Sequence, residues 1–150
     1  MFSLDGRVAV VTGASRGLGA AVADGLAAAG AKVVGVARSV PADGVETLVE
    51  YESCDVTDTA RFKELCGLVM RKWGRIDILV NAAGVTLPAE GLRQDLSVFR
   101  KTIETNLSSL YACCTAVAEN MDGHRGGSII NFTSIGAVQF LCSNASSYMT

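Results

Sequence analysis

The sequence lacks an apolar run long enough to cross a membrane, since none reaches the ~20 residues that a spanning helix needs. Its first residues, 1–7, lack the charged start and the apolar centre of a signal peptide. A formal net charge of −2 provides no basic field that would attract nucleic acid. We therefore expect a cytoplasmic protein that binds neither membranes nor nucleic acids.

Histidine is nearly absent, and the cysteines show no metal-binding pattern. The one histidine, His124, lies in a segment that contains glycine and aspartate, where a solvated loop residue is expected. No CxxC spacing joins the five cysteines, which are Cys54, Cys66, Cys113, Cys114 and Cys142. We expect no metal site, and we expect these thiols to be reduced and mostly buried as small hydrophobic groups.

A short β-branched run near the start of the chain leads directly into closely spaced glycines. Residues 8–11 precede the segment Thr12-Gly13-Ala14-Ser15-Arg16-Gly17-Leu18-Gly19, and an alanine-rich segment follows. A strand, a glycine turn and a helix N-terminus in this order can hold the pyrophosphate of a dinucleotide. Gly13 allows a sharp turn, Gly17 allows close approach to the phosphates, and Gly19 allows tight packing of the helix. No lysine follows the last glycine, which argues against an ATPase.

Strand-like and helix-like segments alternate along the chain, with no repeat and no linker between domains. This alternation predicts a parallel sheet with right-handed crossovers. The expected strands are 7–12, 31–37, 48–54, 75–81 and 128–133, and the expected helices are 17–29, 58–73 and 97–121, with a further helix beginning in the last residues. We interpret residues 1–150 as a single α/β domain.

Several short motifs follow the glycine turn at separate positions. They are an acidic residue, Asp55, a turn of sequence Asn81-Ala82-Ala83-Gly84, and then Asn106, Ser134 and Tyr148. In this order, together with the TGxxxGxG pattern of residues 12–19, they resemble the short-chain dehydrogenase/reductase family in its classical form. The resemblance covers about residue 4 to the last residue. It implies a Rossmann-type doubly wound parallel sheet with strand order 3-2-1-4-5.

The sequence departs from the family pattern in two places. Ala82 replaces a second asparagine, a change that we expect to be harmless. The sequence given ends at Thr150, two residues after Tyr148, so it does not include the lysine expected at position 152. We expect this chain to be the truncated N-terminal part of the domain, inactive and prone to self-association on its own. The alternative is a non-catalytic nucleotide-binding or interaction module that is complete at 150 residues.

The end of the second expected strand indicates which dinucleotide is preferred. Sites selective for NAD usually carry an acidic residue there, but this chain has Ala37 followed by Arg38. The resemblance places Arg16 on the same side, so two guanidinium groups could hold a 2′-phosphate, and we expect NADP(H). Asp55 is expected to accept a hydrogen bond from the adenine amino group. The full set of expected cofactor residues is Gly13, Ser15, Arg16, Gly17, Leu18, Gly19, Arg38, Asp55, Val56, Asn81, Ala82 and Gly84.

The resemblance also assigns the chemistry, which is the interconversion of a ketone and a secondary alcohol by hydride transfer. Tyr148 is expected to deliver a proton to the substrate oxygen, since a phenol with a pKa near ~10 is protonated at neutral pH. Ser134 is expected to hydrogen-bond that oxygen, and Asn106 to hold a water that links the site to solvent. The opening residues, 1–8, resemble those of sugar-acid and polyol dehydrogenases as well as 3-oxoacyl reductases, so the substrate remains open.

The expected long helix is apolar nearly all round between Asn106 and Val117, which is more than one buried stripe requires. One interpretation is a helix enclosed within its own fold. The other is a subunit interface, and the resemblance favours it. We therefore expect a homo-dimer or homo-tetramer with two-fold symmetry through this helix.

Overall fold

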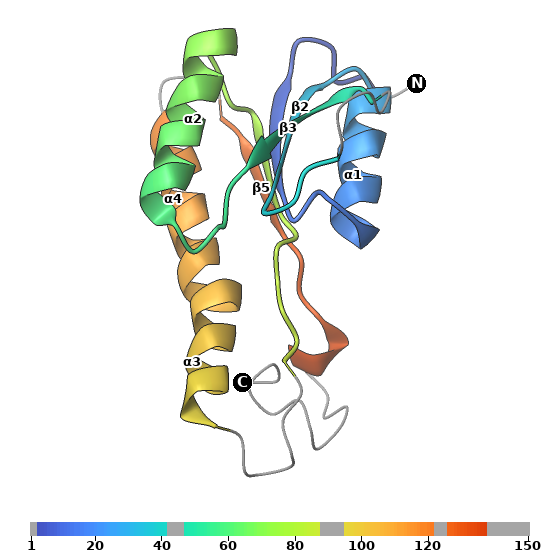
Figure 1. The fold of residues 1–150 in the computed structure, drawn as a ribbon. Coiled ribbons are helices and arrows are strands. Elements are labelled where there is room, and N and C mark those ends of the chain that lie inside the picture. Colours follow the sequence, from blue (N-terminus) through green and yellow to red (C-terminus); the bar gives the residue numbers. More distant parts are fainter. Residues whose placement is uncertain (1–2, 42–46, 88–94, 122–125, 138–150) are drawn as a thin grey trace.

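The computed structural model describes residues 3–41, 47–87, 95–121 and 126–137, which form one parallel sheet covered by helices on both faces (Figure 1). The strands are β1 (Val8–Thr12), β2 (Lys32–Ala37), β3 (Val49–Ser53), β4 (Ile78–Asn81) and β5 (Ser128–Asn131). Their order in the sheet is β3-β2-β1-β4-β5. The predicted fold class and strand order are confirmed.

Helices α1 (Gly17–Ala28), α2 (Thr59–Trp73), α3 (Leu96–Ile103) and α4 (Ser109–Met121) follow the strands, and a short 3₁₀ turn covers Ile135–Ala137. Helix α1 covers one face of the sheet, and α2 and α4 cover the other (Figure 1). Strand β1 shows why both faces are needed. Val8 and Val10 belong to the core under α2 and α4, whereas Ala9 and Val11 belong to the core under α1. A strand buried on both faces is typical of a parallel sheet.

The helix ends follow local chemistry that the sequence predicts. Helix α2 begins after Asp58, whose side chain accepts a hydrogen bond from the backbone N–H of Arg61 at 3.0 Å, and it ends at Gly74 with φ +74°. Gly30, which follows α1, has φ +99°. Gly30 thus has the left-handed conformation that often follows a helix, and the expected helix start at Asp58 is confirmed to within one residue.

The expected helix 97–121 is not one continuous α-helix. Helices α3 and α4 are joined by a π-helical turn over Glu104–Ser108, which we call the π-turn. Within it, the Asn106 side chain accepts a hydrogen bond from the backbone N–H of Val85 and donates one to the Val85 carbonyl, each at 2.8 Å. The turn therefore places one amide where it satisfies both backbone groups of a residue beyond β4. Such turns are often found at functional sites.

A buried carboxylate ties together the amino ends of three strands. Asp77, with 4% of its surface exposed, accepts hydrogen bonds from the Val8 N–H at 2.9 Å, from Arg7 at 2.9 Å and from Arg75 Nε at 2.8 Å. Its own backbone donates to Val8 and accepts from Ser128. Burial opposes ionisation, but these hydrogen bonds outweigh it and hold the pKa of Asp77 below its usual range.

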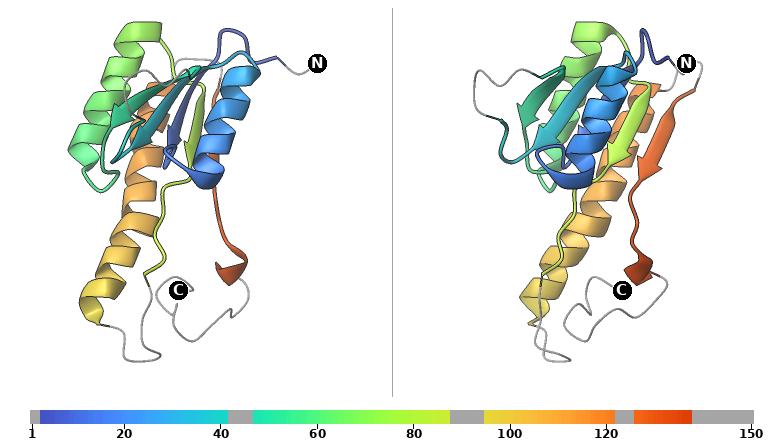
Figure 2. Two further views of the ribbon diagram at one scale, coloured as in Figure 1. Left: turned by 45° about the vertical axis from the view of Figure 1, so that its right-hand side comes forward. Right: turned by 90° about the vertical axis from the view of Figure 1, so that its right-hand side faces the viewer.

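The helix made of α3, the π-turn and α4 extends past the carboxyl ends of the strands (Figure 2). In the described part of the chain, no helix is long and apolar enough to cross a membrane. The described thiols are all free, with Cys54, Cys66 and Cys113 buried, as expected. Among the same residues no cluster of metal-binding side chains is found. His124 and Cys142 lie outside the described residues.

Candidate functional site

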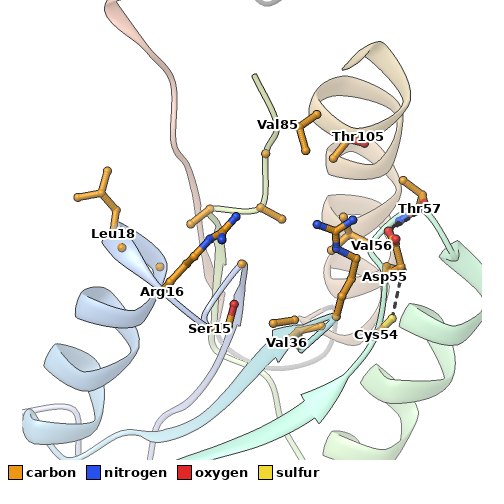
Figure 3. A pocket seen from close by; sticks show the side chains of 18 of the residues that line it. Ser15, Arg16, Leu18, Val36, Cys54, Asp55, Val56, Thr57, Val85 and Thr105 are labelled. Atoms are coloured by element: carbon orange, nitrogen blue, oxygen red, sulfur yellow. Dashed lines mark hydrogen bonds between the residues drawn. The ribbon is translucent and has the colours of Figure 1, made fainter. Parts of the chain in front are cut away.

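A cavity of about 520 Å³ lies at the carboxyl ends of the strands, between the glycine turn and the start of the long helix (Figure 3). The residues that line it come from four loops, from the start of α1, from the end of β2, and from α3 and the π-turn. They are Gly13, Ser15, Arg16, Gly17, Leu18, Gly19, Val36, Ala37, Arg38, Cys54, Asp55, Val56, Thr57, Ala82, Ala83, Gly84, Val85, Lys101, Glu104 and Thr105. Of the residues expected to hold a cofactor, only Asn81 is missing from this wall.

Two of the glycines are needed for different steric reasons. Gly13 has φ +69°, and a Cβ there would lie 2.7 Å from the backbone nitrogen of Ala83. The turn after β1 therefore packs directly against the turn after β4, and any side chain at Gly13 would separate them. Gly17 has φ +59° but open space around its missing Cβ, which leaves backbone exposed to the cavity.

Helix α1 begins at this cavity without a side-chain cap. Arg16, at the N-cap position, makes no capping hydrogen bond, and the first turn carries no acidic residue. The starts of α2 and α3 are different, because Asp58 and Asp95 accept hydrogen bonds from their backbone N–H groups. The uncapped N-terminus of α1 therefore offers backbone N–H groups and the positive end of the helix dipole to an anion. This geometry fits the pyrophosphate of a dinucleotide.

Both arginines that were expected to meet a 2′-phosphate line one hollow next to the cavity. Arg16 and Arg38 are exposed there, with Ser15, Ser39, Val40 and Pro41. The backbone of Arg38 is anchored, because Ser53 Oγ donates a hydrogen bond to its carbonyl at 3.2 Å. Ala37 is buried, and among the described residues no carboxylate lines this hollow. These residues therefore give the hollow two cations, two hydroxyls and no opposing charge.

Asp55 lies on the opposite side of the cavity from Arg16 (Figure 3). Its Oδ1 accepts hydrogen bonds from the Thr57 backbone N–H at 3.0 Å and from the Thr57 hydroxyl at 2.8 Å. These hydrogen bonds, with the nearby charges of Arg38 and Lys101, lower the pKa of Asp55, although partial burial opposes the shift. The carboxylate is thus ionised and held in a fixed orientation. Val56 next to it is buried and contributes apolar wall.

Asn81 lies at the end of β4 but faces its neighbours instead of the first cavity. Its side-chain amide donates to Asn131 Oδ1 at 2.9 Å and to the Cys114 sulfur at 3.3 Å. It therefore joins β4 to β5 and to α4. Thr12 has a related role, since its hydroxyl accepts a hydrogen bond from the Ala83 N–H at 3.2 Å. These contacts fix the Ala82–Gly84 turn, which lines the cavity.

A second cavity of about 360 Å³ adjoins the first and contains two of the three expected catalytic residues. Asn106 and Ser134 both line it, with Leu110 and Phe132 nearby. Ser134 is partly buried, and its Oγ accepts a hydrogen bond from the Gly136 N–H at 3.1 Å. Each polar end of the Asn106 side chain makes one hydrogen bond to Val85. One N–H and one lone pair of the amide remain, and the water contact expected for Asn106 stays a prediction. Tyr148 lies outside the described residues.

Sequence analysis missed the residues that the long helix contributes to the first cavity, which are Lys101, Glu104 and Thr105. The expected helix covered these positions, but its pattern does not show which turn lies beside the carboxyl ends of the strands. Tyr51 was also missed. Its hydroxyl donates to the Ala14 carbonyl, at 3.4 Å, behind the glycine turn.

The sequence matches the family described as "short chain dehydrogenase" over residues 7–150. Among curated proteins, D-threitol dehydrogenase of Mycolicibacterium smegmatis is 38% identical over 143 residues, which cover 89% of this chain and 54% of that protein. A 3-oxoacyl-(acyl-carrier-protein) reductase of Escherichia coli is 38% identical over 140 residues, which cover 89% of this chain and 57% of the relative. The chain thus spans about half the length of the curated relatives it matches.

The fold is also similar to solved structures. Carveol dehydrogenase of Mycobacterium avium, crystallised in complex with NAD, matches with a TM-score of 0.88 at 25% sequence identity. The match covers 99% of this chain and 61% of that chain.

Proposed function

Because the chain belongs to the short-chain dehydrogenase family, we propose that it forms the cofactor-binding part of an NADP(H)-dependent oxidoreductase. The proposed reaction interconverts a ketone and a secondary alcohol. Polyols and 3-oxoacyl thioesters are the leading substrate classes, since the names of two relatives refer to them.

The main support for this proposal is that the two cavities share a wall. Leu18 and residues 82–85 line both of them. A dinucleotide whose adenosine half occupies the first cavity and whose phosphates meet the start of α1 would extend past this wall into the second cavity. Its reactive end would then lie beside Ser134. Pockets at the carboxyl ends of parallel strands are the usual place for such ligands.

The preference for NADP(H) rests on the hollow that contains Arg16 and Arg38. A 2′-phosphate there would accept charge-assisted hydrogen bonds from both guanidinium groups. NAD(H) would gain nothing in return, because Ala37 offers no carboxylate to its ribose hydroxyls. The complex of carveol dehydrogenase contains NAD, so the family relationship alone does not decide between the two cofactors.

The bound dinucleotide would supply a hydride to the carbonyl carbon, or accept one from the alcohol. The protein has to stabilise and protonate the substrate oxygen as negative charge develops there. Ser134 Oγ would donate a hydrogen bond to that oxygen, and the Tyr148 hydroxyl would deliver the proton. Asn106 would act by holding Val85, and with it the wall between the cavities, in place.

The cofactor preference is tested by fluorescence titration of the purified protein with NADPH and NADH. We expect NADPH to bind at least about tenfold more tightly, since charge-assisted hydrogen bonds contribute roughly 1.5–3 kcal/mol each. Arg38→Asp should move the preference toward NADH. Arg71→Asp, at an exposed position of α2 that lines neither the cavity nor the hollow, is the matched control and should leave it unchanged. Equal affinities for the two cofactors would contradict the proposal.

A further inference from the structure

The side of the first cavity opposite the glycine turn carries a second pair of charges. Thr105 and Asp55 lie on this side, away from Leu18 and Arg16 (Figure 3). Lys101 also lines the cavity, and it lies one helical turn before Thr105 on the same helix face. A lysine and an aspartate from two different elements thus border one end of the same cavity.

Lys101 is available to a ligand. Its side chain is exposed, and none of the ion pairs among the described residues involves it. It is close enough to Asp55 that its charge contributes to lowering the pKa of that carboxyl, together with Arg38 and after the hydrogen bonds from Thr57. The ammonium therefore lies within electrostatic reach of the carboxylate without a direct ion pair.

One carboxylate oxygen of Asp55 accepts hydrogen bonds within the protein, and the other can accept one from a ligand. The Thr57 backbone N–H and hydroxyl both donate to Oδ1, and none of the described residues donates to Oδ2. A carboxylate held in this way presents a fixed acceptor to the cavity. Beside it, the Lys101 ammonium has three donors and no acceptor.

We propose that Lys101 acts with Asp55 to select adenine as the base of the cofactor, with Lys101 Nζ donating to the ring nitrogen next to the exocyclic amine. This inference rests on the proposed function, namely that the cavity holds a dinucleotide. The edge of adenine has an amino donor beside a ring-nitrogen acceptor, which matches a carboxylate beside an ammonium. Hypoxanthine has a carbonyl oxygen and an N–H at those two positions. Its acceptor would face the carboxylate and its donor would face the ammonium, so neither hydrogen bond could form.

A different role for Lys101 would be general attraction of the phosphates through its positive charge. That attraction depends on the charge of the ligand and not on the base. NADP⁺ and nicotinamide hypoxanthine dinucleotide phosphate carry the same phosphates, and they differ at the six-position of the base. The ratio of their affinities therefore separates base reading from long-range attraction.

The test is isothermal titration calorimetry of the purified protein with these two ligands. We expect NADP⁺ to bind about tenfold or more tightly than the hypoxanthine analogue, as hydrogen bonds to charged groups allow. Lys101→Met should reduce this ratio by about threefold to tenfold. Lys101→Gln, which keeps a donor, should reduce it less. Arg100→Met removes a positive charge from the neighbouring exposed position, outside the cavity wall, and should leave the ratio unchanged.

Two outcomes would overturn the inference while leaving the proposed function intact. If Lys101→Met weakens both ligands equally, Lys101 acts only as a distant charge. If it changes neither affinity, Lys101 does not contact the ligand. Failure of the unaltered protein to bind either dinucleotide would contradict the proposed function and the inference together. Thermal unfolding of each variant shows whether it remains folded, as expected for changes at an exposed position.

Discussion

Two hydroxyl side chains are assigned to the substrate oxygen, and they can be separated by mutation. In a chain that includes the family's lysine after Tyr148, Tyr148→Phe should lower kcat for ketone reduction by about 100-fold or more, because the proton donor is lost. NADPH affinity should change little, since the phenol acts on the substrate. Ser134→Ala should lower kcat less. Steady-state rates with a panel of ketones measure these effects.

Ser147→Ala is the control for Tyr148→Phe, since it removes the neighbouring hydroxyl, and it should keep most of the rate. If Tyr148→Phe retained most of the unaltered rate, another residue would have to deliver the proton.

Asp77 should make stability depend on pH in the acid range. Its pKa is lower in the folded protein than in the unfolded chain, so its contribution is complete above about pH 5. It is lost progressively as the pH falls through ~3.9 toward the folded-state value. We expect Asp77→Asn to lower the free energy of unfolding by about 2 kcal/mol at neutral pH, because two arginines lose a buried partner. Urea unfolding at several pH values measures both effects.

Glu119→Gln is the matched control for Asp77→Asn, since it removes an exposed carboxylate that is paired with Lys63. Exposed pairs contribute little, so its unfolding midpoint should stay close to that of the unaltered protein. A steep acid dependence that survives in Asp77→Asn would show that other carboxylates produce it.

At the residue level, sequence analysis identified side chains that lie next to each other along the chain. The glycine turn is an example, because Gly13, Gly17 and Gly19 are all set by one local turn. Lys101 and Asp77 were not identified, since each acts on partners far away in the sequence. Lys101 lines the same cavity as Asp55 although the two residues are far apart in the sequence, and Asp77 contacts Val8 across 69 positions.

Among the elements, the π-turn has the clearest consequence for binding. Asn106→Asp keeps an acceptor for the Val85 N–H but loses the donor to the Val85 carbonyl and adds a negative charge there. We expect this change to lower the free energy of unfolding by about 1–3 kcal/mol and to weaken NADPH binding, because Val85 lines both cavities. Chemical denaturation and fluorescence titration are the measurements.

Asn120→Asp is the control on the same long helix, since the Asn120 amide donates to the Ala116 carbonyl at 2.6 Å outside both cavities. It should leave NADPH affinity unchanged. If Asn106→Asp bound NADPH as tightly as the unaltered protein, the π-turn would not be needed to hold the wall.

The elements themselves were largely predictable, because hydrophobic runs and capping residues are local signals. The end of the expected strand 48–54 and the start of α2 at Asp58 agree with the structure to within one residue. The break in the long helix was not predicted, since residues 104–108 have ordinary helical composition. The π-turn depends on Val85, which lies in a loop before the helix and shares no periodic pattern with it.

For the whole molecule, the exposed apolar side chains of the long helix support the expected association of two copies. Leu107 and Tyr111 are 59% and 70% exposed and lie one turn apart. We propose that they form part of a homo-oligomer interface. Leu107→Glu should therefore shift the molar mass measured by light scattering toward the monomer.

Leu68→Glu offers a matched control, because Leu68 is also an exposed leucine, at 38%, on α2. It should leave the molar mass unchanged. If the unaltered protein were monomeric, the proposed interface would be contradicted. If Leu107→Glu and Leu68→Glu lowered the molar mass equally, the interface would not be specific to the exposed face of the long helix.

The contacts of Asp77 also determine how the sheet opens. Strand ends normally fray, and their amide protons then exchange with solvent first. Here the amides of Val8 and Ser128 are held by the side chain and the backbone of one buried residue at the amino edge. We expect these terminal amides to exchange as slowly as those at strand centres. We therefore expect opening motions to be confined to the carboxyl edge, so that the loops around the cavities can move while the register of the strands is kept.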